Sequence, residues 1–198
     1  MVYCITSKNT GQAMKPYPAD LWQRVVELLT QQSYSLAVAE SCTGGGIGKA
    51  VTEISGSSRV FLGGVIAYAN EAKTNLLGVP NKTLVLHGAV SFETAHAMLE
   101  GVQRLFSSSC AIATTGIAGP TGGSPEKPVG TVFIAIKTPQ KELLYHCLWE
   151  GNRHTIREQS IAFAGIQLAR LLGETGFEEA FPEIVEQRIF LTDGGNRA

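Results

Sequence analysis

The sequence contains very little aspartate, although acidic residues as a whole are not scarce. Of the 17 acidic side chains among 198 residues, only Asp20 and Asp193 are aspartates, and both lie near the chain ends. Enzymes that transfer phosphoryl groups usually hold magnesium with aspartate, and Ser-His-Asp triads use an aspartate to orient the histidine. Because glutamate can take over either task, the shortage disfavours both mechanisms without excluding them.

Long apolar segments and an excess of basic charge are also missing. The best apolar run, residues 60–67, falls well short of the ~20 residues that span a bilayer. The N-terminus lacks the basic and apolar regions of a signal peptide. The 16 basic and 17 acidic side chains give a net charge of −1. We therefore expect a cytoplasmic protein that binds neither membranes nor nucleic acid.

Cysteine is scarce and scattered. No CxxC pair occurs among the four cysteines, and the four histidines are dispersed along the chain. Structural zinc sites need closely spaced ligands, so the sequence predicts a reduced protein with no metal site. No motif points to a cofactor either.

A large apolar fraction is what the chain does contain. Hydrophobic residues make up 44% of the sequence and the net charge is almost zero, which excludes an intrinsically disordered protein. At about 100 to 200 residues per domain, the length fits a single domain. We expect an N-terminal arm over residues 1–19, one domain over 20–172 and a C-terminal tail over 173–198. An apolar segment at 189–191 leaves open whether that tail packs back.

Apolar periodicity predicts helices and strands in alternation. Amphipathic patterns predict helices over 21–32, 71–77, 92–105 and 155–172, and a shorter one that ends near Ile54. Short apolar runs predict buried strands over 35–39, 60–68 and 110–114, followed by a hairpin of 130–137 and 142–149. This alternation predicts an α/β fold, a three-layer α/β/α sandwich with a mixed, partly parallel sheet.

Three unusual clusters each follow a predicted strand: residues 40–46, 68–73 and 114–123. In open α/β sheets, ligands bind beyond the carboxyl ends of the strands. If the three strands are parallel neighbours, the clusters meet along one edge of the sheet. We expect the functional site at that edge.

The first cluster is a glycine-rich turn between a strand and a helix. It resembles a phosphate-binding loop, but Ala50 replaces the hydroxyl that would hold magnesium. Three residues of the nucleophile type lie in the turn: Ser41, Cys42 and Thr43. The backbone N–H groups of Thr43, Gly44 and Gly45 could form an oxyanion hole beside such a nucleophile. The structural alternative is a turn that only packs the helix against the strand.

A nucleophilic serine needs a base, and Lys73 is the best placed candidate. If Asn70 caps the next helix, Lys73 lies in its first turn, where the helix dipole and burial both favour the neutral amine. Tyr68, at the preceding strand end, could bridge Ser41 and Lys73 by a hydrogen bond. A solvated surface lysine and an ordinary strand tyrosine are the structural alternatives, and a histidine base is disfavoured because no histidine has an aspartate nearby.

The third cluster is a glycine- and proline-rich loop. Thr115, Gly116 and Gly119 lie where a ligand could approach the backbone closely. Arg153 and Arg157 are one helical turn apart and could form a phosphate clamp. A solvated helix face would explain the same two arginines.

Together these motifs resemble the CinA C-terminal domain family, which includes the nicotinamide-nucleotide amidohydrolases. The resemblance covers about residues 20 to 172 in the order and spacing of the family. It is carried by Ala-Glu-Ser-Cys-Thr-Gly-Gly at 39–45, Tyr-x-Asn-Glu-Ala-Lys at 68–73, Leu-Gly-Val at 77–79, Gly-Ala-Val-Ser at 88–91, Thr-Gly-Ile-Ala-Gly-Pro at 115–120 and Lys-Pro-Val-Gly-Thr-Val at 127–132.

The resemblance implies deamidation of nicotinamide mononucleotide to nicotinate mononucleotide and ammonia, in pyridine nucleotide recycling. It implies Ser41 as nucleophile, Lys73 as base and Tyr68 as the hydroxyl that assists proton transfer. The oxyanion would meet the turn amides of Thr43 to Gly45, and the substrate phosphate would meet the loop of 116–119 or Arg153. It further suggests a homodimer, and it requires neither a metal nor a cofactor.

The departures from the family pattern are few. Phe92 stands where an acidic residue is usual, and Ala69 where serine is common. Neither belongs to the expected chemistry. The rival interpretation is a catalytically silent nucleotide-binding or regulatory module, and a nucleotide kinase is disfavoured by the broken phosphate loop.

Overall fold

The computed structural model describes residues 4–5, 18–176 and 184–191. These residues form one seven-stranded sheet in the order β1-β7-β6-β5-β4-β2-β3. The strands are β1 (Cys4–Ile5), β2 (Leu36–Glu40), β3 (Phe61–Ile66), β4 (Cys110–Gly116), β5 (Thr131–Lys137), β6 (Lys141–Leu148) and β7 (Ile184–Leu191). The helices are α1 (Leu21–Gln31), α2 (Gly46–Thr52), α3 (Asn70–Leu77), α4 (Asn81–His87), α5 (Phe92–Phe106) and α6 (Arg153–Leu171), with a 3-10 turn η1 (Ser57–Arg59).

The sheet has a parallel half and an antiparallel half. Strand β2 lies between β3 and β4 and is parallel to both, so the carboxyl ends of these three strands share one edge. From β4 onward, β5, β6, β7 and β1 pair antiparallel. The predicted mixed, partly parallel sheet is therefore confirmed.

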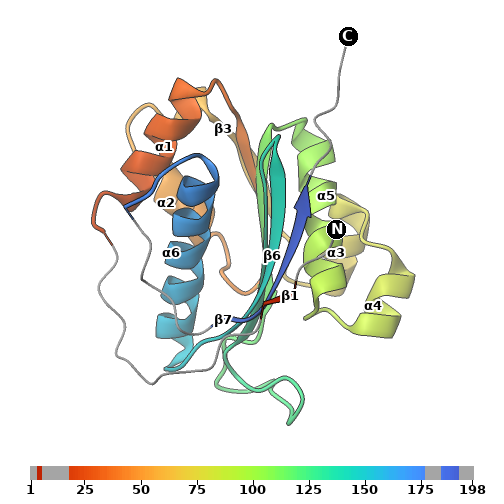
Figure 1. The fold of residues 1–198 in the computed structure, drawn as a ribbon. Helices are drawn as coiled ribbons and strands as arrows, with labels where there is room; N and C mark the ends of the chain where they lie inside the picture. The colour runs from red at the N-terminus through yellow and green to blue at the C-terminus, as the bar shows by residue number, and fades with distance from the viewer. Residues whose placement is uncertain (1–3, 6–17, 177–183, 192–198) are drawn as a thin grey trace.

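Helices cover both faces of the sheet. Figure 1 shows α1, α2 and α6 on one face and α3, α4 and α5 on the other. The strands separate two apolar cores accordingly, because successive side chains point to opposite faces: Leu36 and Val38 of β2 join the core under α1 and α6, and Ala37 and Ala39 join the core under α5. The three-layer α/β/α sandwich is confirmed.

Helix α1 forms as its sequence pattern predicts. Leu21, Val25 and Leu29 are buried on one face, at the spacing that an amphipathic helix requires. Asp20 occupies the N-cap position, but its side chain makes no capping hydrogen bond.

Several elements of the structure were not predicted from the sequence. Helix α4 has no buried residue, so no apolar periodicity marks it in the sequence. Strand β7 lies within the expected tail, and it pairs with β6 from Ile184 to Leu191. Part of the tail therefore packs back and extends the sheet, and β1 from the expected arm pairs with β7. The remaining parts of the arm that lie outside the described residues are 1–3 and 6–17.

Within the described part of the chain, no helix has the length and apolar character needed to cross a membrane. Cys42, Cys110 and Cys147 are buried thiols that form no disulfide.

Candidate active site

The three clusters predicted from the sequence meet at one pocket. This cavity of about 320 Å³ opens at the carboxyl edge of the parallel strands. Its lining includes the predicted residues Ser41, Tyr68, Asn70, Lys73, Thr115, Gly116, Gly119 and Arg153. The predicted residues Thr43, Gly44 and Gly45 are not part of it.

Ser41 follows the last residue of β2 and is 7% exposed. Its backbone N–H donates to the carbonyl of Thr114 at 3.0 Å, which holds it to the end of β4. Its Oγ lies 3.2 Å from the Nζ of Lys73. The nucleophile and base that were predicted from separate parts of the chain are therefore in direct contact.

Lys73 is 1% exposed, which is rare for a lysine. Its Nζ donates to the carbonyls of Ala67 at 2.9 Å and Tyr68 at 3.2 Å. Burial lowers the pKa of this amine, and Cys42 and Glu71 oppose the shift more weakly. A neutral amine can donate its two N–H groups to the two carbonyls and direct its lone pair to the Ser41 hydroxyl. This arrangement suits a general base.

The N-terminus of α3 differs from the prediction in one detail. Asn70 is the first helical residue and Ala69 holds the N-cap position, without any side-chain cap. The predicted cap at Asn70 is therefore wrong. Lys73 still lies in the first turn, because its backbone N–H donates to the carbonyl of Ala69, and Asn70 lines the pocket.

Tyr68 does not bridge Ser41 and Lys73 in this structure. The residue is 60% exposed, and its hydroxyl accepts a hydrogen bond of 2.9 Å from Arg153. The contact with Lys73 is made by the Tyr68 carbonyl. A bridge is not needed, because the serine and the lysine touch directly.

The amides of Gly44 and Gly45 are already occupied, which removes two of the three predicted oxyanion donors. The N–H of Gly44 donates to the Ser41 carbonyl at 3.1 Å. The N–H of Gly45 donates at 3.0 Å to the buried carboxylate of Glu40. Of the three predicted donors, Thr43 remains.

Other groups fix the turn from the side. Arg157 donates to the carbonyl of Thr43 at 2.7 Å through one terminal nitrogen and at 3.3 Å through Nε. The Thr43 and Thr114 hydroxyls share a hydrogen bond of 2.7 Å. Arg157 is thus engaged by the turn. The clamp of Arg153 and Arg157 that the sequence suggested does not form in this structure.

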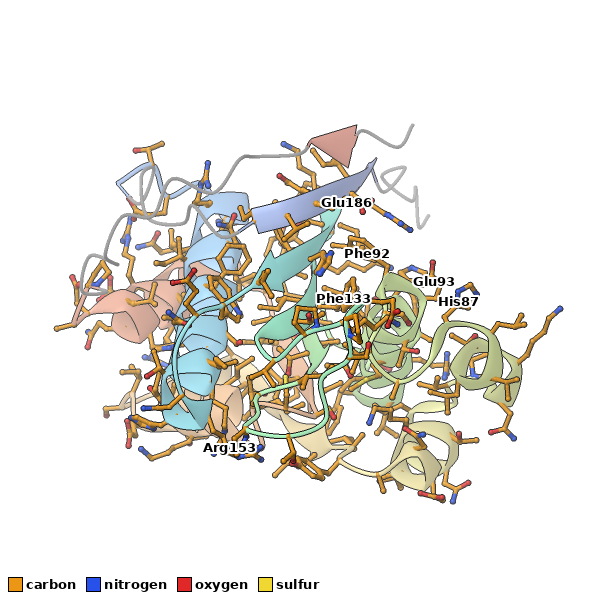
Figure 2. All side chains as sticks on the ribbon, turned by 90° about the horizontal axis from the view of Figure 1, so that it is seen from below. His87, Phe92, Glu93, Phe133, Arg153 and Glu186 are labelled. Carbon is orange, nitrogen blue, oxygen red and sulfur yellow. The ribbon has the colours of Figure 1, made fainter. Side chains whose placement is uncertain are left out.

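Arg153 and the loop after β4 form the opposite wall. Arg153 donates to the Gly119 carbonyl at 2.8 Å as well as to Tyr68. Thr115 donates through its hydroxyl to the Ala89 carbonyl at 2.6 Å. Figure 2 shows Arg153 at the start of α6, apart from the cluster of Phe92, Phe133 and Glu186 that lies toward β7.

Cys42 as an alternative nucleophile and a histidine as an alternative base are both disfavoured by the structure. Burial raises the pKa of the Cys42 thiol to about 12, so at neutral pH it stays protonated. The four histidines all lie in the described part of the chain, and none lines this pocket.

Three residues at the site were not predicted from the sequence. Ala89 and Val90 line the pocket, and Glu40 lies outside its lining. Glu40 is 1% exposed at the end of a strand of apolar residues. A single acidic residue that directly follows an apolar run, immediately before a glycine-rich turn, was the available signal.

The fold and the pocket define an α/β protein with a buried serine–lysine pair at the carboxyl edge of a mixed sheet. The chain belongs to the CinA C-terminal domain family, whose model matches residues 19–172. The resemblance found in the sequence is thereby confirmed.

Among its relatives are CinA-like proteins of Syntrophus aciditrophicus, 50% identical over 150 residues, and of Leptospira biflexa, 47% identical over 151 residues. These alignments cover 75% and 74% of this chain but only 36% of each relative. The chain therefore spans about a third of the length of these curated relatives.

Solved structures of similar proteins share the fold. A competence/damage inducible protein of Agrobacterium tumefaciens is 38% identical, with a TM-score of 0.75, and the match covers 81% of this chain and 100% of that one. A competence or damage-inducible protein of Enterobacter asburiae is 28% identical, with a TM-score of 0.77, covering 80% of this chain and 100% of that one.

Proposed function

We propose that this chain is an amidohydrolase that removes ammonia from the carboxamide of nicotinamide mononucleotide. The observation that carries the proposal is the buried amine of Lys73 at 3.2 Å from the Ser41 hydroxyl, inside a pocket. The choice of substrate rests on the motifs that resemble nicotinamide-nucleotide amidohydrolases. The product is nicotinate mononucleotide, and the reaction serves pyridine nucleotide recycling.

In the first half of the reaction, Lys73 takes the proton of the Ser41 hydroxyl as Oγ attacks the carboxamide carbon. The C–O bond forms and the carbonyl oxygen becomes an oxyanion. When the oxyanion collapses, the C–N bond breaks and Lys73 returns the proton to the departing nitrogen, which leaves as ammonia. The result is an ester between Ser41 and the pyridine carboxyl carbon.

In the second half, water replaces ammonia. Lys73 takes a proton from water, the hydroxide attacks the ester carbon, and the proton returns to Ser41 as the carboxylic acid is released. Neither half needs a metal ion. The two carbonyls that accept from Lys73 keep its Nζ in reach of Oγ throughout both halves.

The substrate phosphate is expected at Arg153. Together with Lys73 this arginine supplies the positive side chains of the pocket lining, and its guanidinium donates to Gly119 and Tyr68. A phosphate oxygen could replace either acceptor and gain a charge-assisted hydrogen bond. If the phosphate replaces the Tyr68 hydroxyl as the acceptor from Arg153, this hydroxyl is released from the arginine. We propose that it then assists proton transfer.

The test measures ammonia released from nicotinamide mononucleotide with EDTA present. Ser41→Ala and Lys73→Ala should each abolish release while circular dichroism shows an intact fold. Cys42→Ala is the matched control next to Ser41 and should retain activity. Activity that survives Ser41→Ala would refute the serine mechanism. A folded wild type that binds the nucleotide but releases no ammonia would instead favour the silent binding or regulatory module.

We also propose that the protein is cytoplasmic and forms a homodimer. The support for dimerisation is the family resemblance together with apolar side chains that remain exposed on α3 and α4, namely Leu76, Val85 and Leu86. Sedimentation equilibrium should give twice the chain mass of 21.1 kDa. A single species at the chain mass would refute the dimer.

A further inference from the structure

Glu40 has a carboxylate that is buried at the base of the Ser41 turn. The residue is 1% exposed, and its side chain does not line the pocket. Its two oxygens accept from the N–H groups of Gly45 at 3.0 Å, Ile47 at 3.1 Å and Gly48 at 2.8 Å. These N–H groups belong to the N-cap and the first turn of α2.

Such N–H groups have no partner within their own helix and often bind an external anion. Here the chain supplies the anion itself, from the residue that directly precedes Ser41. The turn of 41–44 is therefore closed into a loop, with Glu40 bonded to its far end. A substrate phosphate finds no free amides there, since the N–H groups of residues 44–48 already donate to the Glu40 carboxylate and to the carbonyls of Ser41 and Thr43.

The backbone of Glu40 reaches the base as well. Its carbonyl accepts from the N–H of Ala67 at 2.8 Å. The carbonyl of Ala67 in turn accepts from the Nζ of Lys73 at 2.9 Å. Glu40 is thus bonded on one side to the turn that carries Ser41 and on the other to the segment that holds Lys73.

We propose that Glu40 is a positioning residue that keeps the Ser41 Oγ within reach of the Lys73 amine. The inference rests on the proposed serine–lysine amidase, and it adds a residue that never touches the substrate. The loss of three hydrogen bonds at the base of the turn lets Ser41 drift, and a displacement of about 1 Å of a catalytic group can slow a reaction about 100-fold.

The variant Glu40→Gln keeps the shape of the side chain but turns one acceptor oxygen into an N–H donor that faces backbone N–H groups. We expect kcat to fall 10- to 100-fold with KM changed less than threefold, because Glu40 is outside the pocket. Glu40→Asp keeps the charge but is one methylene shorter, and should fall between Glu40→Gln and the wild type. Glu53→Gln at the other end of α2 is the control, since this glutamate is exposed and pairs with Lys49, and it should match the wild type.

A second readout does not depend on the substrate. The rate at which a fluorophosphonate probe labels Ser41 reports the reactivity of this hydroxyl, and it should fall in Glu40→Gln and partly recover in Glu40→Asp. If the wild type releases no ammonia, the proposed function fails, while the labelling rates still decide the role of Glu40. Equal labelling of the wild type and folded Glu40→Gln, or a kcat within twofold of an active wild type, would overturn the inference. A change confined to KM would overturn it as well.

Discussion

The Lys73 amine has three oxygen neighbours and almost no contact with solvent: the Ser41 hydroxyl and the carbonyls of Ala67 and Tyr68. A charged ammonium could donate to all three, so the geometry alone permits both protonation states. Burial favours the neutral form, because desolvation penalises the charged ammonium and lowers the pKa of Lys73. A neutral amine next to a serine is the state that nucleophilic catalysis requires.

Activity should therefore rise with pH as Lys73 loses its proton, with a midpoint below the 10.5 of an ordinary lysine. The sign follows from the base being active when neutral. Lys73→Arg should lower kcat at least 100-fold at every accessible pH, because a guanidinium does not deprotonate in proteins. Lys49→Arg, at an exposed position, is the control. The measurement is kcat against pH, and an active Lys73→Arg enzyme would contradict the assignment.

A second pH effect belongs to His96, outside the pocket. Its Nε2 lies 3.0 Å from the buried carboxylate of Glu142, and this hydrogen bond raises the pKa of His96 while burial and Lys137 oppose the shift. The stabilisation is present below the unfolded pKa of about 6.5 and is lost as pH rises through the raised folded value.

His96→Gln should therefore destabilise the protein more at pH 5.5 than at pH 9. The difference should stay below about 1 kcal/mol, because the imidazole is half exposed and solvent screens the pair. Urea unfolding at both pH values measures it, with exposed His154→Gln as the control. An equal loss of stability at both pH values would show that the charge of His96 contributes nothing.

The role of a residue could be predicted from the sequence where its type is unusual for its position. It could not be predicted where the role depends on hydrogen bonds to backbone groups. Ser41 and Lys73 stand out by type and position, and the structure brings them together. The role of Glu40 could not be read from the sequence, since it depends on which amides face the carboxylate in three dimensions. For the same reason the amides of Gly44 and Gly45 could not be excluded as oxyanion donors from the sequence.

Among the elements, the turn from β2 to α2 has the strictest backbone requirements. Gly45 has φ of +91°, a conformation that side chains rarely adopt, and a Cβ there would lie 2.9 Å from Cδ1 of Ile66. Gly48, in the first turn of α2, has no such φ, and a Cβ there would meet its nearest atom, an oxygen of Glu40, at 3.6 Å.

Alanine should therefore act in opposite directions at these two glycines. Gly45→Ala should destabilise the protein by about 1 to 3 kcal/mol through backbone strain. Gly48→Ala should be neutral or stabilise it by up to about 1 kcal/mol, because alanine is the better helix residue. Chemical denaturation of both variants checks this, and equal losses would show that helix α2 rather than the conformation of Gly45 is limiting.

Elements with a strong apolar period were predictable and the others were not. The buried face of α1 and the apolar strand β4 carry such a signal. Helix α4 carries none, because it packs along α5 without burying a residue. Strand β7 could not be predicted, because its formation depends on the edge that β6 offers for pairing, which is a property of the assembled sheet.

For the whole molecule, the two halves of the sheet have different tasks. The parallel strands β2, β3 and β4 bring the three clusters that line the pocket to one edge. The antiparallel strands extend the sheet away from the pocket, and β7 at Ile184 and Ile189 packs against the core under α6. Strand β7 lies beyond residues 19–172, which the family model matches.

Removal of β7 should therefore lower the free energy of unfolding while leaving kcat almost unchanged. Truncation after Gly176 leaves β6 paired with β5 alone and exposes apolar surface that Ile184 and Ile189 cover, so we expect a loss of roughly 2 to 4 kcal/mol. The pocket contains no residue of β6 or β7, so kcat well below the melting temperature should stay within about threefold of the wild type. Truncation after Leu191, which keeps β7, is the control and should preserve stability. Calorimetry with ammonia release tests both parts, and a folded but inactive Gly176 truncation would show that β7 contributes to catalysis after all.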